Sequence, residues 1–267
     1  MNTQQITDLA IKRHDIDASH FQNTYLENDS KKLNKRETVF LKGRELVLEE
    51  LTLLLNKLPQ GSKVLDVGCG TAHLTNWIKE QGFEVSGIEP SSEMYNFAIT
   101  NFPEIEIKQG ISSNIPYPDN YFDLIVAFEV LRYLDKNENM NSFVEFNRVL
   151  KNDGSFFITQ VNLFCTDFYF MFHKVKSIYY NAFNLTHHFC NFTTSREQEK
   201  EIKNAGFKNV NTIGRFMGST RLAYKFGKKI GNFHNFIMKK IFDKQRFSRS
   251  IYKNFSAHLI VIAKKGK

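Results

Sequence analysis

Two acidic residues and two glycines, at fixed spacing, form the part of this sequence best suited to chemistry. Asp66, Gly68 and Gly70 lie in the segment VLDVGCGT at residues 64–71, where a short apolar run meets a glycine-rich turn. Glycine tolerates positive φ and lets a ligand approach the backbone closely, and a helix that follows offers unpaired N–H groups. Glu89 stands nineteen residues after Gly70, at the end of the next expected strand. A carboxylate there can accept two hydrogen bonds from a ribose diol.

Two kinds of adenosine cofactor suit such a turn. A dinucleotide-binding turn has the pattern G-x-G-x-x-G, but the third glycine position is occupied here by His73. Asp66, placed ahead of the first glycine, would repel a pyrophosphate but suits a cofactor that carries an amine and a positive charge. The residues therefore favour S-adenosylmethionine (SAM).

The elements that must position these residues alternate between short apolar runs and helical patterns. The expected strands are 64–67, 83–89, 105–107, 122–128, 155–159, 207–210 and 257–263, and the expected helices are 37–58, 72–81, 91–100 and 138–150. Strands that alternate with helices indicate βαβ units, whose crossovers are right-handed. The sequence therefore predicts an α/β fold with a doubly wound, mostly parallel sheet and helices on both faces.

Four segments follow one another between residues 40 and 160: VLDVGCGTAHL, GIEPSSEM, IPYPDNYFDLIVAFEVLRYL and FNRVLKNDGSFFIT. Their order and spacing resemble those of class I SAM-dependent methyltransferases, and the most similar subgroup is the small-molecule one called type 11. The resemblance implies a Rossmann-like sheet of seven strands whose last strand, here 256–264, runs antiparallel. It also implies that the protein is an enzyme and that SAM is its cofactor.

The resemblance assigns SAM-binding roles to residues at the strand ends. Asp66 would meet the methionine end through the turn, Glu89 would hold the ribose, and Met94 would lie near the adenine. Phe128 would lie beside the cofactor at the end of the fourth strand. Ile111 stands where the family commonly has an acid, so the adenine would depend on backbone groups and apolar contacts. The expected cofactor-binding residues are Asp66, Gly68, Cys69, Gly70, Glu89, Pro90, Met94, Ile111 and Phe128.

Methyl transfer from a sulfonium mainly requires that the acceptor be aligned and water excluded. A general base is needed only where the acceptor holds its proton, as a hydroxyl does. The candidates are Tyr133, His187 and His188, whereas the family often has a histidine where Arg132-Tyr133 stands here. We expect a small or lipid-like acceptor, methylated at a hydroxyl oxygen, and no metal. Two alternatives stay open: an RNA methyltransferase and a SAM-binding scaffold without activity.

Composition predicts a globular protein with a folded core. The 267 residues are 42% hydrophobic and 24% charged, and three scattered cysteines suggest a reduced, cytoplasmic setting. We expect an N-terminal helical cap at 1–60, a SAM-binding domain at 61–161 and 201–267, and an aromatic helical insert at 162–200. The insert is interpreted either as a lid over an apolar substrate or as a helical patch that buries its own aromatic residues.

The basic charge is concentrated in a segment at 221–254, within the SAM-binding domain. The net charge is +8, and eleven Lys/Arg against one acid lie between residues 215 and 254. Apolar residues at helical spacing form a stripe: Leu222, Phe226, Ile230, Phe233, Ile237 and Ile241. A helix packed on the domain with a solvated basic face is one interpretation, and a helix lying peripherally on an anionic membrane surface is the other. Nucleic acid is less favoured, because the segment matches no RNA-binding module.

Overall fold

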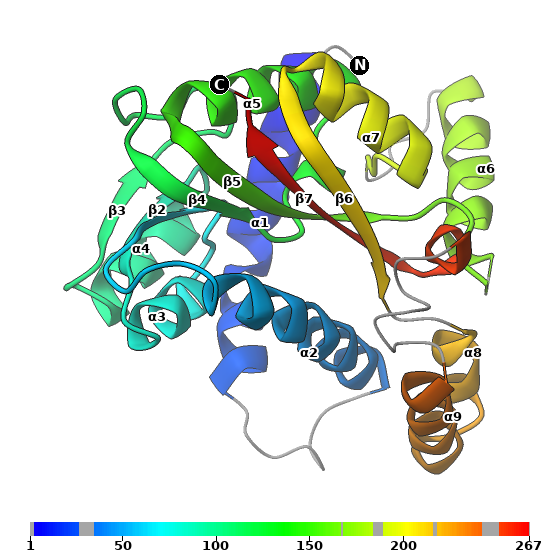
Figure 1. The fold of residues 1–267 in the computed structure, drawn as a ribbon. Coiled ribbons are helices and arrows are strands. Elements are labelled where there is room, and N and C mark those ends of the chain that lie inside the picture. Colours follow the sequence, from blue (N-terminus) through cyan, green and yellow to red (C-terminus); the bar gives the residue numbers. More distant parts are fainter. Residues whose placement is uncertain are drawn as a thin grey trace.

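A seven-stranded sheet organises the protein in the computed structural model (Figure 1), which describes residues 3–26, 35–166, 168–183, 189–215, 218–241 and 251–266. The strands are β1 (Lys63–Val67), β2 (Glu84–Glu89), β3 (Glu106–Gln109), β4 (Phe122–Ala127), β5 (Leu150–Val161), β6 (Phe207–Arg215) and β7 (His258–Lys265). Their order is β3-β2-β1-β4-β5-β7-β6, and only β7 runs antiparallel to its neighbours. The expected sheet, including the direction of its last strand, is confirmed.

Helices cover both faces of this sheet (Figure 1). They are α1 (Thr3–Leu26), α2 (Lys35–Leu55), α3 (His73–Glu80), α4 (Ser92–Asn101), α5 (Lys136–Val149), α6 (Tyr169–Ala182), α7 (Ser195–Asn204), α8 (Thr220–Lys225) and α9 (Lys228–Ile241), with short 3₁₀ helices η1 (Leu131–Tyr133) and η2 (Ile251–Phe255). Phe156 joins the core beneath α5 and α7, while its neighbour Phe157 joins the core beneath α2 and α3. Successive strand residues point to opposite faces, so β5 contributes to both cores.

A buried ion pair ties the N-terminal region to the far edge of the sheet. Glu50 of α2 and Arg215, the last residue of β6, are both buried, and their carboxylate and guanidinium are in contact. In Figure 1, α2 runs across one face of the sheet toward the end of β6. This pair therefore fixes α2 on the sheet, together with the apolar side chains of Val47 and Leu51.

The fifth strand is longer than the sequence indicates. It was expected at 155–159, because Asn152, Asp153 and Gly154 are residues typical of turns. The structure keeps them within β5, with Asp153 at a positive φ of 63° and a register shift against β4. Asn, Asp and Gly are favoured both in turns and at irregular positions inside a strand, so the local sequence does not distinguish the two.

The segment at 221–242, which carries the apolar stripe and several lysines, does not form one packed helix. The chain turns at Gly227, whose φ is +136°, and so divides the segment into α8 and α9. Tyr224 and Gly231 pack the two helices together, while Phe226 and Phe233 of the stripe face solvent. The interpretation as a helix whose apolar stripe packs on the domain is wrong, because stripe residues on both sides of the turn, such as Leu222 and Ile230, are exposed.

The aromatic insert also fails to bury its own aromatic residues. Phe164, Phe168, Phe172 and Tyr179 are exposed, and Phe170 is buried.

None of the helices in the described parts of the chain has the length and apolarity to cross a bilayer.

Candidate cofactor and acceptor site

The turn after β1 is shaped by residues in the left-handed conformation. Gly68 and Gly70 have φ values of +66° and +56°. The backbone N–H groups of Gly68 and Cys69 both donate to the carbonyl of Ile88, at 2.8 and 3.0 Å. A Cβ on Gly68 would lie 2.5 Å from a methyl group of Val130, so this position needs glycine for space as well as for φ.

Glu89 closes the turn from the neighbouring strand. One oxygen of its buried carboxylate accepts from the Gly70 N–H at 2.8 Å, and the other accepts from the Ser91 N–H at 2.9 Å. A carboxylate has about four acceptor positions, so two remain for the hydroxyls of a ribose. Burial raises the pKa of Glu89 to about 7, against the two backbone hydrogen bonds, which lower it.

Asp66 lies beneath the same turn. Its buried carboxylate accepts from the Thr75 hydroxyl at 2.8 Å, and burial raises its pKa to about 7. Arg44 of α2 lowers that pKa through its charge, and its guanidinium lies 5.1 Å from the centre of the Phe128 ring. Arg44 therefore places a positive charge beside Phe128 and near Asp66. The sequence analysis missed this cation.

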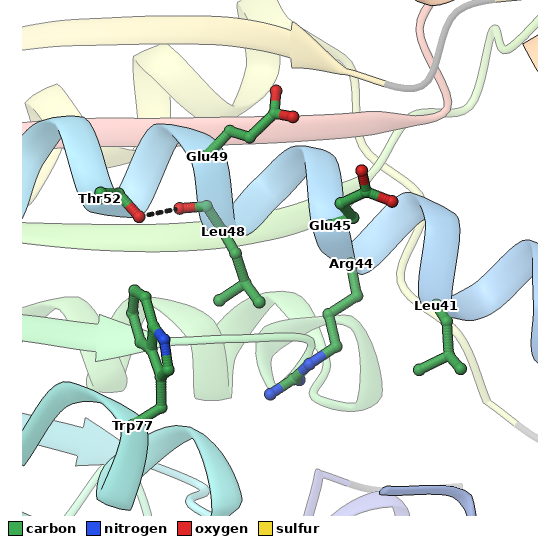
Figure 2. Close-up of a pocket in the computed structure, with 7 residues that line it drawn as sticks. All are labelled: Leu41, Arg44, Glu45, Leu48, Glu49, Thr52 and Trp77. Atoms are coloured by element: carbon green, nitrogen blue, oxygen red, sulfur yellow. Dashed lines mark hydrogen bonds between the residues drawn. The ribbon is translucent and has the colours of Figure 1, made fainter. Parts of the chain in front are cut away.

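Figure 2 shows Arg44 in a cavity of about 450 Å³ between α2 and α3. Arg44, Leu48 and Leu41 point from one side of α2 into this space, which Trp77 of α3 closes. No spacing rule connects residue 44 with the turn at 66–70. Only the packing of α2 on the sheet brings the two together.

A second cavity, of about 340 Å³, lies beside the ends of β2 and β3. Pro90 and Ile111 line it, as the resemblance implies for residues near the adenine, and Gly110 lies between the strand end and Ile111. Ile11 of α1 forms another wall, which the sequence did not reveal. Gln109 and Asn114 add amide groups to this otherwise apolar lining, a combination suited to a flat base with polar edges.

Helix α1 contacts two elements next to the candidate site. At one end Thr3 donates to Asp135, the N-cap residue of α5, at 2.5 Å. Further along, Asp15 accepts from the Ser91 hydroxyl at 2.6 Å, and Ser91 in turn donates its N–H to Glu89. These contacts bring the first helix of the expected cap next to Glu89.

The remaining predicted cofactor residues, Met94 and Cys69, lie at or beside the turn after β1. Met94 is buried in the first turn of α4, and its sulfur lies 3.6 Å from where a Cβ on Gly70 would be. Cys69 is buried, and burial raises the pKa of its thiol, so the thiol is protonated at neutral pH and unsuited to act as a nucleophile. The structure therefore brings all nine predicted residues to the ends of β1, β2, β3 and β4.

A partly buried charged cluster lies where β4 ends. Glu129 has a positive φ of 63°, and its carboxylate accepts from Arg132 at 2.6 Å and lies 3.3 Å from Nδ1 of His258. Its backbone N–H donates to the hydroxyl of Thr159 at 2.7 Å. Despite burial, the charges of Arg132 and His258 hold the pKa of Glu129 well below its usual range. The sequence analysis did not single out Glu129.

The three residues named as base candidates have different outcomes. Tyr133 lies in η1, and its ring meets the ring of His14 edge-on at 4.7 Å. Burial raises the pKa of its phenol, so the hydroxyl stays protonated at neutral pH. His187 and His188 lie outside the described residues. Within the described ranges, no group of three or more His, Cys, Asp or Glu residues is arranged to hold a metal ion.

The raised pKa values of Asp66 and Glu89, both about 7, predict that SAM affinity depends on pH. A bound cation and a ribose diol favour the ionised carboxylates, so binding below pH 7 must release protons and affinity must rise with pH. We expect roughly a tenfold gain or more between about pH 6 and pH 8. Calorimetry in buffers of different ionisation enthalpy measures both quantities, and a flat profile without proton release would contradict the assignment. Glu89→Gln should reduce the slope.

Comparisons with known proteins agree with this geometry. Residues 40–212 match a family model described as a methyltransferase domain. The chain is 31% identical over 141 residues to an uncharacterized methyltransferase of Alkaliphilus oremlandii, an alignment that covers 53% of this chain and 62% of that protein. It is 26% identical over 176 residues to the ubiquinone/menaquinone biosynthesis C-methyltransferase UbiE of Campylobacter jejuni, covering 57% and 72%.

A solved SAM-dependent methyltransferase from Thermotoga maritima has a TM-score of 0.57 and 19% identity, covering 87% of this chain and 95% of that chain. At this identity the likeness shows the fold alone. The chain spans 62%, 41% and 53% of the lengths of the first three curated relatives that it matches.

Proposed function

Because this chain belongs to the methyltransferase domain family, among the class I SAM-dependent methyltransferases, we propose that it transfers the methyl group of SAM to a small or lipid-like acceptor, at a hydroxyl oxygen. The observation that carries the proposal is the carboxylate of Glu89, fixed by Gly70 and Ser91 with acceptor positions left over for a ribose. SAM, when bound, supplies a methyl group on a positively charged sulfur.

The opposite charges of Arg44 and Asp66 suit the methionine part of SAM. We assign the carboxylate of that part to Arg44, whose guanidinium lies over Phe128, and its ammonium to the region of Asp66. The SAM carboxylate would then face the Arg44 guanidinium, and the SAM ammonium would face the Asp66 carboxylate. When bound, SAM would give its methyl group to the acceptor oxygen and leave as S-adenosylhomocysteine, and the hydroxyl proton would pass to solvent or to a nearby base.

We propose that the residues after β4 receive the acceptor. Arg132 lies 3.7 Å from the sulfur of Cys190 and 6.0 Å from the centre of the Phe170 ring, so the start of the aromatic insert adjoins the charged cluster. We propose that the insert at 162–200 forms an apolar wall for the acceptor. Glu129 acts as a positioning residue, because it holds Arg132 and not the reacting atoms.

A second candidate acceptor is a quinone precursor methylated at ring carbon. The similarity to a ubiquinone/menaquinone C-methyltransferase favours it, because such a ring is both apolar and hydroxylated. The two candidates differ in product: oxygen transfer gives a methyl ether, and carbon transfer leaves the hydroxyl free. Mass spectrometry with fragmentation separates these products.

The deciding experiment is a methyl-transfer assay with radiolabelled SAM on fractionated cell extract. Lipids, RNA and polar metabolites are separated before counting. Label in the lipid fraction supports the proposal, label in RNA supports the alternative RNA methyltransferase, and SAM binding with no label in any fraction supports an inactive scaffold.

Tyr133→Phe tests how far transfer depends on a side-chain base. The phenol is held protonated, so we expect it to orient the acceptor through one hydrogen bond, and its loss to lower methyl incorporation about tenfold. Loss of a general base would cost about 10²–10⁴-fold instead. Labelled-methyl incorporation and SAM affinity are measured together, with Tyr121→Phe at the opposite end of β4 as the matched control.

A further inference from the structure

Large apolar side chains are exposed on four neighbouring helices, α6, α8, α9 and η2. Figure 1 shows these helices along one side of the molecule, beyond the carboxyl end of β5. The most exposed members are Phe172, Ile178, Phe226, Phe233, Phe236 and Ile251. Monomeric soluble proteins rarely expose large contiguous apolar patches, and such patches mark partner or membrane surfaces.

Contacts between the four helices make them one surface. The guanidinium of Arg221 in α8 lies 4.4 Å from the ring centre of Phe170 at the start of α6. The N–H of Thr166, just before α6, donates to the carbonyl of Phe255 in η2 at 3.2 Å. Tyr224 links α8 to α9 through a 2.6 Å hydrogen bond to Asn232. We call this surface the apolar–basic face.

The charge on this face has a single sign. The residues of α6, α8, α9 and η2 include nine lysines and arginines and not one aspartate or glutamate. Lys239 pairs with Glu45 and Glu49 of α2, which anchors α9 on the body of the protein. Lys229 and Lys240 are exposed on the same side of α9 as the exposed phenylalanines, and the Lys240 ammonium lies 6.0 Å from the Phe236 ring centre.

We infer that the apolar–basic face docks on an anionic lipid bilayer. Phenylalanine and aliphatic side chains would enter the boundary between headgroups and acyl chains, while the lysines would contact anionic headgroups. The face adjoins the charged cluster through Arg132 and Phe170, so a docked enzyme would take its acceptor from the bilayer. That last step rests on the proposed function, whereas docking itself does not.

Two other occupants fit the face less well. A second copy of this chain would bring together two faces with the same excess of positive charge, and these repel each other. Nucleic acid would satisfy the lysines, but the aliphatic residues among the exposed set, such as Ile230 and Ile251, offer no ring for a base to stack on. A bilayer satisfies both the charges and the apolar groups.

Vesicle co-sedimentation of the full chain tests the inference. We expect binding to vesicles of phosphatidylcholine mixed with phosphatidylglycerol, weak binding to phosphatidylcholine alone, and a decline as salt is raised. The double change Lys229→Glu with Lys240→Glu should weaken partitioning at least about twentyfold, since each lysine near an anionic surface contributes about fivefold. Phe233→Ser with Phe236→Ser should weaken it comparably, because it removes the apolar anchors.

Matched controls and a separate readout keep the outcomes distinct. Lys57→Glu and Val144→Ser change exposed residues elsewhere on the protein and should leave vesicle binding unchanged. The thermal shift with S-adenosylhomocysteine is recorded for every variant, so failure of cofactor binding is seen separately from failure of docking. Equal binding of wild type and both double variants would overturn the inference. Tight RNA binding without vesicle binding, or a dimer that the phenylalanine changes dissociate without vesicle binding, would overturn it as well.

Discussion

Glu89→Ala should remove the thermal stabilisation that SAM or S-adenosylhomocysteine gives to the wild-type protein. Two hydrogen bonds from a ribose diol to this carboxylate contribute about 1.5–3 kcal/mol each, so affinity should fall at least about hundredfold. A ligand raises the melting temperature only when its concentration exceeds its dissociation constant, so the shift should vanish at concentrations that saturate the wild type.

The substitution also removes the acceptor for the Gly70 and Ser91 N–H groups, so each shift is measured against the same variant without ligand. Glu84→Ala is the matched control, because Glu84 is an exposed glutamate at the start of the same strand. A full shift in Glu89→Ala would refute the ribose assignment. No shift in the wild type would refute cofactor binding itself.

Glu50→Ala should lower the free energy of unfolding by about 3–5 kcal/mol, because it removes the carboxylate that the buried guanidinium of Arg215 contacts. The guanidinium would stay buried between α2 and β6 without this counter-charge. A loss of this size is a large fraction of the stability of an ordinary domain. Urea unfolding monitored by circular dichroism gives the free energy of unfolding.

The neighbouring residue supplies the control for this substitution. Glu49 pairs with Lys239 at the surface, where an ion pair contributes about 0–1 kcal/mol, so Glu49→Ala should change the free energy of unfolding little. Equal losses for Glu49→Ala and Glu50→Ala would show that burial of the pair is not what stabilises α2.

The centre of the candidate site follows from the sequence because its determinants are local. Gly68 and Gly70 come directly after one strand and Glu89 ends the next, with one helix between them, an arrangement with a fixed geometry in parallel sheets. The helix expected at 91–100 is α4, and the hydroxyl of its N-cap residue Ser91 accepts from the Met94 N–H at 3.2 Å.

The periphery of the site could not be predicted, because it depends on contacts distant in sequence. Ile11 and Asp15 reach the site through the docking of α1 on α4, and Arg44 through the packing of α2. Neither α1 nor α2 carries a sequence motif that indicates which surface it packs against. Hydrophobic periodicity predicts a buried face but not which surface buries it.

The break at Gly227 shows a second limit of periodicity. The apolar stripe continues with unchanged spacing through a residue that ends one helix, so the pattern alone indicated a single helix. A lone glycine inside a helical pattern is tolerated in many helices, at about 1 kcal/mol. Its positive φ is a property of the folded chain that composition does not report.

The position of β7 constrains how the polypeptide acquires its structure during synthesis. Among the strands of the described residues, β6 pairs only with β7, and β7 also forms the outer partner of β5. As the ribosome releases the chain, β5 and β6 therefore emerge with open hydrogen-bonding edges, and neither edge closes before β7 arrives. Unpaired strand edges promote aggregation, so this nascent chain passes through an interval in which a chaperone that shields such edges would raise its yield.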